Sequence, residues 1–243
     1  MCLKAVTALL QFTTIIPLGK PADFEQFARR SYLYPVAGYV IGIPVALVAA
    51  CIPSTALAAA VALALLLLLT GCNHFDGLLD FGDALMAHGS REKRLRALKD
   101  IHVGAGGIAT GVAVILLAFA ALQDIRNMAF AIVIAEVCAK FSMSLLTAWG
   151  KPFQEGIHSY LHSYAKVQFP LYSAVLCVPL LILPGSYLIV GAAVLAALLC
   201  ALGIRAAGYS LFGGINGDCV GAANEITRTA IFLTIAGISL ISL

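Results

Sequence analysis

Residues 55–83 read TALAAAVALALLLLLTGCNHFDGLLDFGD, an apolar run that ends in three carboxylates. If the chain stays helical through the second part, Asp76, Asp80 and Asp83 stand at positions i, i+4 and i+7 and share one face. Like charges this close together beside hydrocarbon are unfavourable unless they are protonated or bind a cation. We therefore interpret the stripe as a site. The stripe predicts a binding site for Mg2+, because this ion prefers oxygen ligands and usually acts on substrates that carry phosphate.

The composition of the chain is that of an integral membrane protein. Of its 243 residues, 61% are hydrophobic and 11% are charged, and the mean hydropathy is +0.98. Soluble domains have roughly 45 to 50% apolar and about 25% charged residues. The length predicts one all-α polytopic membrane helix bundle over residues 1–243, with about seven transmembrane helices and no separate soluble domain.

Seven apolar runs are the candidates for these helices, because their lengths are close to the roughly 17 to 25 residues that a span requires. A shorter N-terminal segment, residues 3–16, is expected to be interfacial or re-entrant. The seven runs are residues 33–52, 55–72, 104–122, 128–149, 167–183, 187–204 and 229–243.

The basic residues gather on one side of the predicted membrane. The connections on the other side, near residues 53–54, 123–127 and 184–186, carry only Arg126. By the positive-inside rule the basic side is cytoplasmic. A transporter would need a site near the midplane and gates on both faces, so this asymmetry favours an enzyme at the cytoplasmic surface of the cell membrane. The residues assigned to the basic side are Lys4, Lys20, Arg29, Arg30, Arg91, Lys93, Arg94, Arg96, Lys99, Lys151, Lys166, Arg205 and Arg228.

The longest predicted cytoplasmic loop, residues 84–103, has a basic run around the apolar pair Leu95 and Leu98. Two interpretations stay open. The run is either an amphipathic helix on anionic membrane lipid or a phosphate-binding element, in which Arg91 and Lys99 contact a nucleotide and the glycine-rich turn at residues 104–107 offers backbone amides. Nucleic-acid binding has no support beyond this run, which the membrane already explains.

A second polar segment, residues 212–225, follows the sixth apolar run. Its glycines and Asn-Gly step predict a turn, after which Asp218 and Glu225 share one helical face. Asp218 either caps the last helix or completes the metal shell, and one role does not exclude the other. Glu225 is the second candidate for that shell or for accepting a proton.

Two ionisable residues, Glu136 and Lys140, interrupt the run 128–149. Each costs roughly 2.5 to 3.5 kcal/mol near a bilayer centre on insertion scales, so the pair should face the bundle interior. It is either a structural ion pair or the wall of a polar cavity in which Lys140 reaches substrate. His158 and His162 are also four residues apart, but they lack a third ligand and are not expected to bind zinc.

Residues 73–83 resemble the HxDGLxDxxD signature of the cobalamin synthase family, the adenosylcobinamide-GDP ribazoletransferases. Three further elements are similar and follow the family's order: a Thr-x-x-Pro element within residues 12–17, a basic loop ending in Lys-Asp and a glycine turn at residues 91–107, and a Gly-Gly-x-Thr-Gly-Asp motif at residues 213–218. The chain departs from the family at Asn216, His102 and Lys140, where Thr, Arg and Arg are expected.

The resemblance implies a transferase of late cobalamin biosynthesis. The 5'-hydroxyl of α-ribazole, or the 5'-phosphorylated form of this acceptor, attacks the cobinamide-linked phosphorus of adenosylcobinamide-GDP and expels GMP. A homo-oligomer and contacts with membrane lipid are left open. The implied metal ligands are Asp76, Asp80, Asp83 and Asp218, with Glu225 as a further catalytic residue, and the implied substrate contacts are His74, Arg91, Lys99, Asp100, Lys140, Gly214 and Asn216.

Two other functional classes are alternatives to this one. A CDP-alcohol phosphotransferase acting on lipid shares the Asp-rich motif and the divalent metal. It would, however, carry an Ala-Arg step shortly after Asp76-Gly77, and this chain does not. A transporter for a vitamin or a cation would move its substrate across the membrane without releasing GMP.

Overall fold

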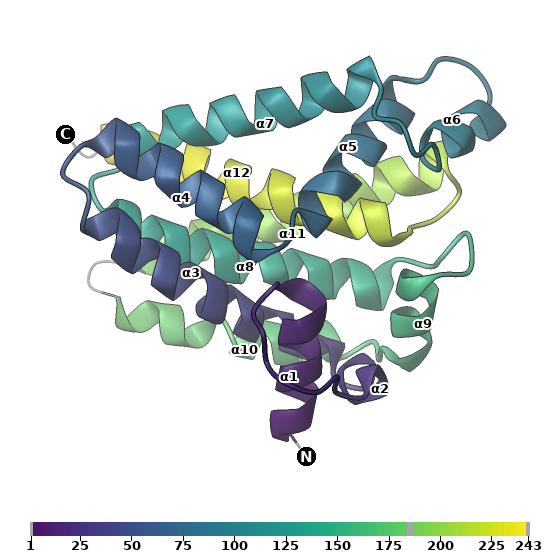
Figure 1. Cartoon of the computed structure of the whole chain (residues 1–243), viewed down its shortest axis with the longest axis horizontal. Coiled ribbons are helices and arrows are strands. Elements are labelled where there is room, and N and C mark those ends of the chain that lie inside the picture. The colour runs from purple at the N-terminus through teal and green to yellow at the C-terminus, as the bar shows by residue number, and fades with distance from the viewer. Residues whose placement is uncertain (1, 184–186, 242–243) are drawn as a thin grey trace.

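The computed structural model describes residues 2–183 and 187–241, and these residues form a bundle of helices (Figure 1). The described residues contain no strand, only one isolated bridge between Pro152 and Ile215, so the predicted all-α class is confirmed. The helices are α1 (Cys2–Thr13), α2 (Phe24–Ala28), η1 (Ser31–Leu33), α3 (Tyr34–Ala50), α4 (Thr55–Leu69), α5 (Asn73–Met86), α6 (Arg91–Ala97), α7 (Ala105–Gln123), α8 (Met128–Trp149), α9 (Ile157–Tyr164), α10 (Phe169–Val175), η2 (Val178–Ile182), α11 (Tyr187–Leu211) and α12 (Gly217–Ile241).

The central helix of the bundle is α8, which is buried along most of its length and contacts α3, α11 and α12. Small residues let the neighbouring helix approach it closely. A Cβ atom at Gly38 of α3 would lie 2.6 Å from the Cα of Val137. Such contacts are common between membrane helices, where packing rather than the hydrophobic effect drives association.

Four segments are long and apolar enough to cross a membrane: Ser31–Ala50, α7, α8 and α11. Two bent pairs would add one span each: α4 with α5, bent by 93°, and α9 with Phe169–Ile182, bent by 91°. The protein is therefore a membrane protein with four to six candidate spans. The prediction of about seven also counted the last helix, α12, whose N-terminal half carries charged residues.

The predicted runs agree best with the structure where no proline or glycine interrupts them. Residues 128–149 coincide with α8, and α1 matches the short N-terminal segment, being only about 18 Å long. The run predicted at residues 167–183 consists of α10 and η2, each with a proline in its first turn, and it forms a candidate span only together with α9, from which it is bent by 91°. The last helix begins at Gly217 rather than at residue 229. Residues 184–186 and 242–243 of the predicted connection and last run lie outside the described residues.

A sharp turn at Gly71 and Cys72 separates the apolar helix α4 from the acidic helix α5. Both residues have left-handed backbone angles, with φ of 60° and 58°, and the Cys72 amide donates to the Leu67 carbonyl at 2.9 Å. This arrangement commonly ends a helix. A Cβ atom at Gly71 would lie 2.8 Å from Cγ2 of Ile15, so packing also requires glycine there. The turn redirects the chain by 93° and carries the Asp residues toward α6 (Figure 1).

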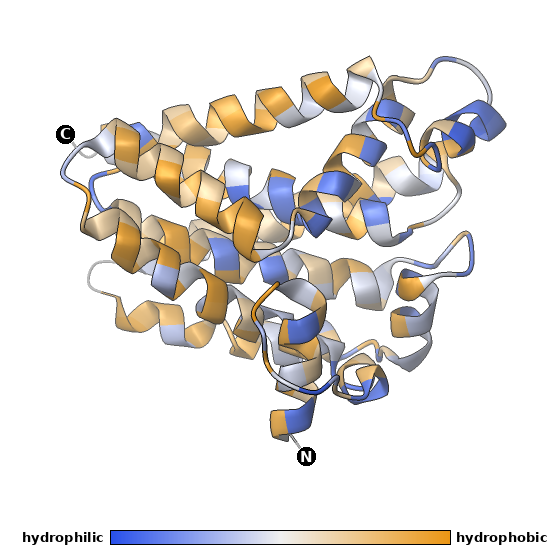
Figure 2. Cartoon of the chain, viewed as in Figure 1, coloured by the Kyte–Doolittle hydropathy of each residue, from blue (hydrophilic) through white to orange (hydrophobic). Residues whose placement is uncertain are grey.

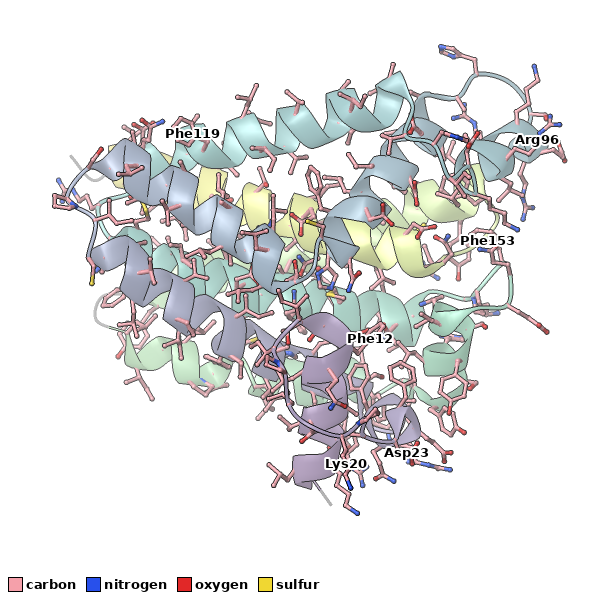
Figure 3. The ribbon with its side chains drawn as sticks, viewed as in Figure 1. Phe12, Lys20, Asp23, Arg96, Phe119 and Phe153 are labelled. Carbon is pink, nitrogen blue, oxygen red and sulfur yellow. The ribbon has the colours of Figure 1, made fainter. Side chains whose placement is uncertain are left out.

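The two ends of the bundle differ in polarity. Hydrophilic residues gather on α5, α6 and the loops beside α9, whereas α3, α4 and α7 are mainly hydrophobic (Figure 2). We call this end the polar end. Arg96 and Phe153 both lie there, while Phe119 lies toward the other end (Figure 3). The connection between α7 and α8, which carries Arg126, also lies at the other end (Figure 1).

Candidate active site at the polar end

Helices α5 and α12 touch through a reciprocal pair of glycines. A Cβ atom at Gly77 of α5 would lie 3.0 Å from the Cα of Asp218, and a Cβ at Gly221 of α12 would lie 3.0 Å from the carbonyl oxygen of His74. Only residues without a side chain permit two helix backbones to approach this closely. The glycine after Asp76 therefore has a structural reason: it brings the carboxylates of two helices to one place.

Four carboxylates gather at this contact, and we call Asp76, Asp80, Asp83 and Asp218 the acidic cluster. Asp80 is its centre, since it is half-buried and lies within electrostatic reach of the other three. Asp76 is exposed at the edge of the cluster. The structure thus brings the late Asp218 next to the stripe on α5, as the sequence predicted.

Asp83 binds the N-terminus of α7. Its Oδ2 accepts a hydrogen bond from the Gly104 amide at 2.7 Å, and its Oδ1 accepts one from the Gly107 amide at 2.8 Å. These amides have no partner within the helix, and a carboxylate there also interacts favourably with the helix dipole. The glycine-rich turn that was a candidate for binding phosphate binds this carboxylate instead.

Replacing Asp83 by Ala should lower the free energy of unfolding by about 0.5 to 2 kcal/mol, because α7 loses its N-terminal cap. The unfolding midpoint in detergent, with heat or denaturant, measures this loss. Asp124→Ala is the matched control, since Asp124 ends the same helix at the opposite end of the bundle. Equal midpoints for the Asp83 variant and the unmodified protein would contradict the capping role.

The oxygens that remain free decide whether the acidic cluster suits Mg2+. Both oxygens of Asp83 are bonded to amides, and Oδ2 of Asp218 accepts a bond from Nδ2 of Asn216 at 2.6 Å. Within residues 2–183 and 187–241, no three His, Cys, Asp or Glu side chains are close enough together to hold a metal on their own. Because Mg2+ is often held by one or two carboxylates together with substrate phosphates, Asp76, Asp80 and Asp218 fit this mode of binding.

Two joined loops hold Asp218 in place. The Ile215 amide donates to the Lys151 carbonyl at 2.9 Å, and a Cβ atom at Gly214 would lie 2.6 Å from the same carbonyl. Asn216 caps α12, because its Oδ1 accepts from the Cys219 amide at 3.1 Å. The capping role left open for Asp218 thus belongs to Asn216.

Gly214 and Asn216 were predicted as substrate contacts, and in the structure both support Asp218. The buried position of each residue agrees with this supporting role. The departure from the family at residue 216 is explained in the same way, since Asn and Thr are both good N-cap residues.

Helix α6 rests on the protein rather than turning its apolar side outward. Leu98 is buried and Leu95 packs against the hydrophobic core. Nη1 of Arg94 donates to the carbonyls of Ala84 and Leu85, at 3.0 and 2.8 Å, and so satisfies the C-terminal end of α5. The apolar pair that suggested a lipid-bound helix is therefore used for docking within the chain.

The substrate contacts predicted in and after α6 do not lie together in the structure. The Arg91 guanidinium occupies the space that a Cβ atom at Gly213 would need, so it lies over the loop that leads to Asp218. Lys99 and Asp100 lie in the exposed connection between α6 and α7. A hydrogen bond from the His102 amide, at 3.0 Å, lowers the pKa of Asp100, and this exposed carboxylate therefore stays an anion that repels phosphate. No hydrogen bond or ion pair among the described residues joins Lys99 or Asp100 to the acidic cluster.

A buried network joins α8 to α12, formed by Glu136, Lys140, Asn224, Glu225 and Arg228. Arg228 donates to Oε1 of Glu136 at 2.9 Å and also pairs with Glu225. Lys140 donates to Oδ1 of Asn224 at 2.7 Å and lies 3.7 Å from Oε2 of Glu136. Two carboxylates and two cations cancel one another, which makes their burial in a medium of low dielectric tolerable.

The network corrects three expectations. Lys140 is fully buried and Glu225 is 1% exposed, so the structure does not bring either side chain to the surface of the acidic cluster as substrate contact or proton acceptor. Of the two interpretations of Glu136 and Lys140, it favours the structural ion pair. Arg228, which was assigned to the cytoplasmic connections, is the buried partner of both carboxylates. The spacing of three residues between Glu225 and Arg228 is the feature of the sequence that could have predicted this ion pair.

Beside the acidic cluster lies a cavity of about 300 Å³, lined by residues of α5, α8, α9 and α12 among others. Asp218 and His74 both line it. His158 lines it too, although its Nε2 bonds the Gly150 carbonyl at 2.8 Å, and His162 bonds the Thr147 carbonyl at 2.9 Å. The four-residue spacing of these histidines therefore serves to cap the C-terminus of α8.

Comparison with known proteins identifies a family that this chain resembles along most of its length. The sequence model of the cobalamin-5-phosphate synthase family matches residues 5–236. Three similar proteins, all named adenosylcobinamide-GDP ribazoletransferase, are each 36% identical to the chain. The protein of Methanocella arvoryzae aligns over 94% of this chain and 93% of its own length, that of Archaeoglobus fulgidus over 97% and 99%, and that of Pyrococcus abyssi over 90% and 92%. No solved structure matches the chain significantly.

Proposed function

The chain belongs to the cobalamin-5-phosphate synthase family, and on this premise we propose how its polar end performs the family's reaction. It is an enzyme, an adenosylcobinamide-GDP ribazoletransferase of late cobalamin biosynthesis. The hydroxyl oxygen of α-ribazole forms a bond to the cobinamide-linked phosphorus of adenosylcobinamide-GDP. The bond from that phosphorus to the bridging oxygen breaks, GMP leaves, and the proton of the hydroxyl passes to the phosphate of the departing GMP or to water.

The observation that carries the proposal is the contact of α5 with α12, which sets Asp218 beside Asp80 and Asp76. One or two of these side chains would hold Mg2+ together with oxygens of the diphosphate. When bound, the ion supplies Lewis-acid stabilisation of the charge on the leaving GMP and a template for its orientation. Asp83 acts on the site indirectly, because it ties α5 to the start of α7.

The remaining residues orient the diphosphate. Arg91 lies over the loop before α12 and is the candidate for a charge-assisted contact with a nucleotide phosphate. Lys99 is exposed on the adjoining connection and is the second candidate. Since phosphoryl transfer needs little covalent help from the protein, positioning and electrostatic stabilisation by these groups account for most of the catalysis.

The location of the site follows from the charge distribution. The basic helix α6 and the loops on either side of the acidic cluster lie at the polar end, and the connection between α7 and α8, which carries Arg126, lies at the opposite end (Figure 1). By the positive-inside rule, the polar end faces the cytoplasm when the bundle spans the cell membrane. The apolar flanks of α3, α7 and α11 are then the surfaces in contact with membrane lipid.

The test of the function is an assay of purified protein in liposomes with adenosylcobinamide-GDP, α-ribazole and Mg2+. We expect GMP and adenosylcobalamin in equal amounts, loss of both with a chelator, and their return when Mg2+ is added back. Product formation that persists after chelation would refute the metal assignment alone. If folded protein makes no product from either α-ribazole or its 5'-phosphate, the proposed reaction is wrong, and CDP-alcohol substrates are tested next.

A further inference from the structure

The cavity beside the acidic cluster is matched in size to only one of the two substrates. Its volume of about 300 Å³ is at the lower end of the roughly 300 to 1,000 Å³ usual for small-molecule sites. A nucleoside such as α-ribazole fits into this space. Adenosylcobinamide-GDP, which combines a corrinoid ring with a nucleotide, is far too large for it.

One wall of the cavity is apolar and comes from several helices. Phe12 of α1, Tyr34 of α3, Met143 of α8 and Leu161 of α9 line it. Tyr34 and Leu161 are almost fully buried, so these side chains form a rigid surface rather than a mobile rim. Such a wall suits the flat apolar base of a nucleoside, since ligand sites combine apolar walls with a few placed polar groups.

The lining also includes two histidines whose hydrogen-bonding capacity is incomplete. His74 and His158 are 5% and 4% exposed, and the Nδ1 atom of each is buried without a hydrogen-bond partner. An unsatisfied buried polar atom costs about 1 to 3 kcal/mol. Two such atoms on residues that line one cavity leave two bonding positions for a polar ligand or an ordered water.

The bonds of His158 decide what its free nitrogen can do. Its Nε2 lies 2.8 Å from the Gly150 carbonyl oxygen, which can only accept a hydrogen bond. The neutral imidazole therefore carries its hydrogen on Nε2, and Nδ1 presents a lone pair. This nitrogen is an acceptor suited to a hydroxyl donor.

Asp218 connects the cavity to the acidic cluster. It lines the cavity next to His158 and also lies within electrostatic reach of Asp80. A second, smaller cavity of about 210 Å³ shares Asp218, His158, Gly217 and Ile157 with the first. A ligand whose polar end reaches these residues has that end beside the carboxylates proposed to hold the diphosphate.

We infer that this cavity is the acceptor site, which binds α-ribazole with its base against the wall of Phe12, Tyr34 and Leu161 and its hydroxyl at Nδ1 of His158. The inference rests on the proposed function and adds the position of the acceptor to it. The corrinoid and its nucleotide then approach from outside the cavity, over the acidic cluster and Arg91. His158 acts as a substrate-binding residue that holds the attacking oxygen near the phosphorus.

The first test separates the two nitrogens of the histidine. In His158→Gln, the side-chain amide still donates to the Gly150 carbonyl, but the acceptor at Nδ1 is lost. We expect the KM for α-ribazole to rise about tenfold, the value of one hydrogen bond, while the KM for adenosylcobinamide-GDP stays within twofold. His162→Asn is the matched control, because it keeps the donor to the Thr147 carbonyl on the same helix and should leave both constants unchanged.

The second test closes the cavity at its edge. Ile157 lines both cavities and is 56% exposed, so Ile157→Trp adds bulk there without disturbing the core. We expect weaker binding of α-ribazole in equilibrium dialysis, performed without adenosylcobinamide-GDP. Tyr160→Trp, on the exposed side of the same helix, should bind α-ribazole as the unmodified protein does.

The outcomes distinguish the inference from the function on which it rests. If the unmodified protein forms product but both cavity variants change only the KM for adenosylcobinamide-GDP, or neither constant, the acceptor site lies elsewhere. If the unmodified protein forms no product, the proposed function fails. The dialysis measurement then still reports whether the cavity binds the nucleoside. Elution profile and unfolding midpoint confirm that each variant is folded.

Discussion

Asp80→Asn is expected to lower kcat by at least about a hundredfold, the largest effect on activity that the structure predicts. Asp80 is the centre of the acidic cluster, and three other carboxylates act on it electrostatically. Asn has nearly the same shape but no charge, so the variant keeps the packing of α5 and loses a ligand for the proposed metal. The assay is product formation at saturating concentrations of both substrates.

The same substitution should not destabilise the protein. Removing one of four neighbouring negative charges relieves repulsion, so the unfolding midpoint should stay the same or rise. A loss of stability together with activity would assign Asp80 a structural role instead. Asp124→Asn, at the far end of the bundle, controls for the general effect of losing a carboxylate. A kcat close to that of the unmodified protein would remove Asp80 from the proposed metal site.

Arg228→Met is expected to cause the largest loss of stability, about 3 to 5 kcal/mol. Arg228 is 2% exposed and pairs with both Glu136 and Glu225. Without it, two buried carboxylates share only the charge of Lys140. The yield of folded protein and the unfolding midpoint in detergent measure the effect, and Arg126→Met at the opposite end of the bundle is the control.

A double variant tests whether unbalanced buried charge causes the loss of stability in Arg228→Met. Arg228→Met combined with Glu136→Gln again leaves one buried cation, Lys140, and one buried anion, Glu225. The double variant should therefore be more stable than Arg228→Met alone, a coupling that independent sites do not show. If the double variant is instead the less stable of the two, the loss of packing rather than unbalanced charge explains the single variant.

The structure separates two acidic residues that look alike in the sequence. Asp218 and Glu225 are seven residues apart on one face of α12, and both were candidates for the metal shell. The structure puts Asp218 beside Asp80 and Glu225 in the ion-pair network with Arg228. Along a helix that runs from the polar end into the bundle, seven residues are about 10 Å of depth, which separates the site from the core.

Composition and local spacing determined the class of the protein and the outline of the site. The apolar runs indicate a membrane bundle, because hydrocarbon requires long helices with satisfied backbones. The 3.6-residue repeat alone places Asp76, Asp80 and Asp83 on one face of α5. The boundaries of α8 agree with the predicted run because no proline or glycine lies within it.

Only the tertiary structure decided which groups meet across helices. Asp83 bonds amides of α7, Arg228 pairs with Glu136 of α8, and His158 both caps α8 and lines the cavity. Spacing along one helix cannot specify such partners, since they depend on how the chain turns at Gly71 and Cys72 and on how closely glycines let α5 approach α12. The face of a helix is a local property, whereas the partner on the next helix is set by the packing of the whole bundle.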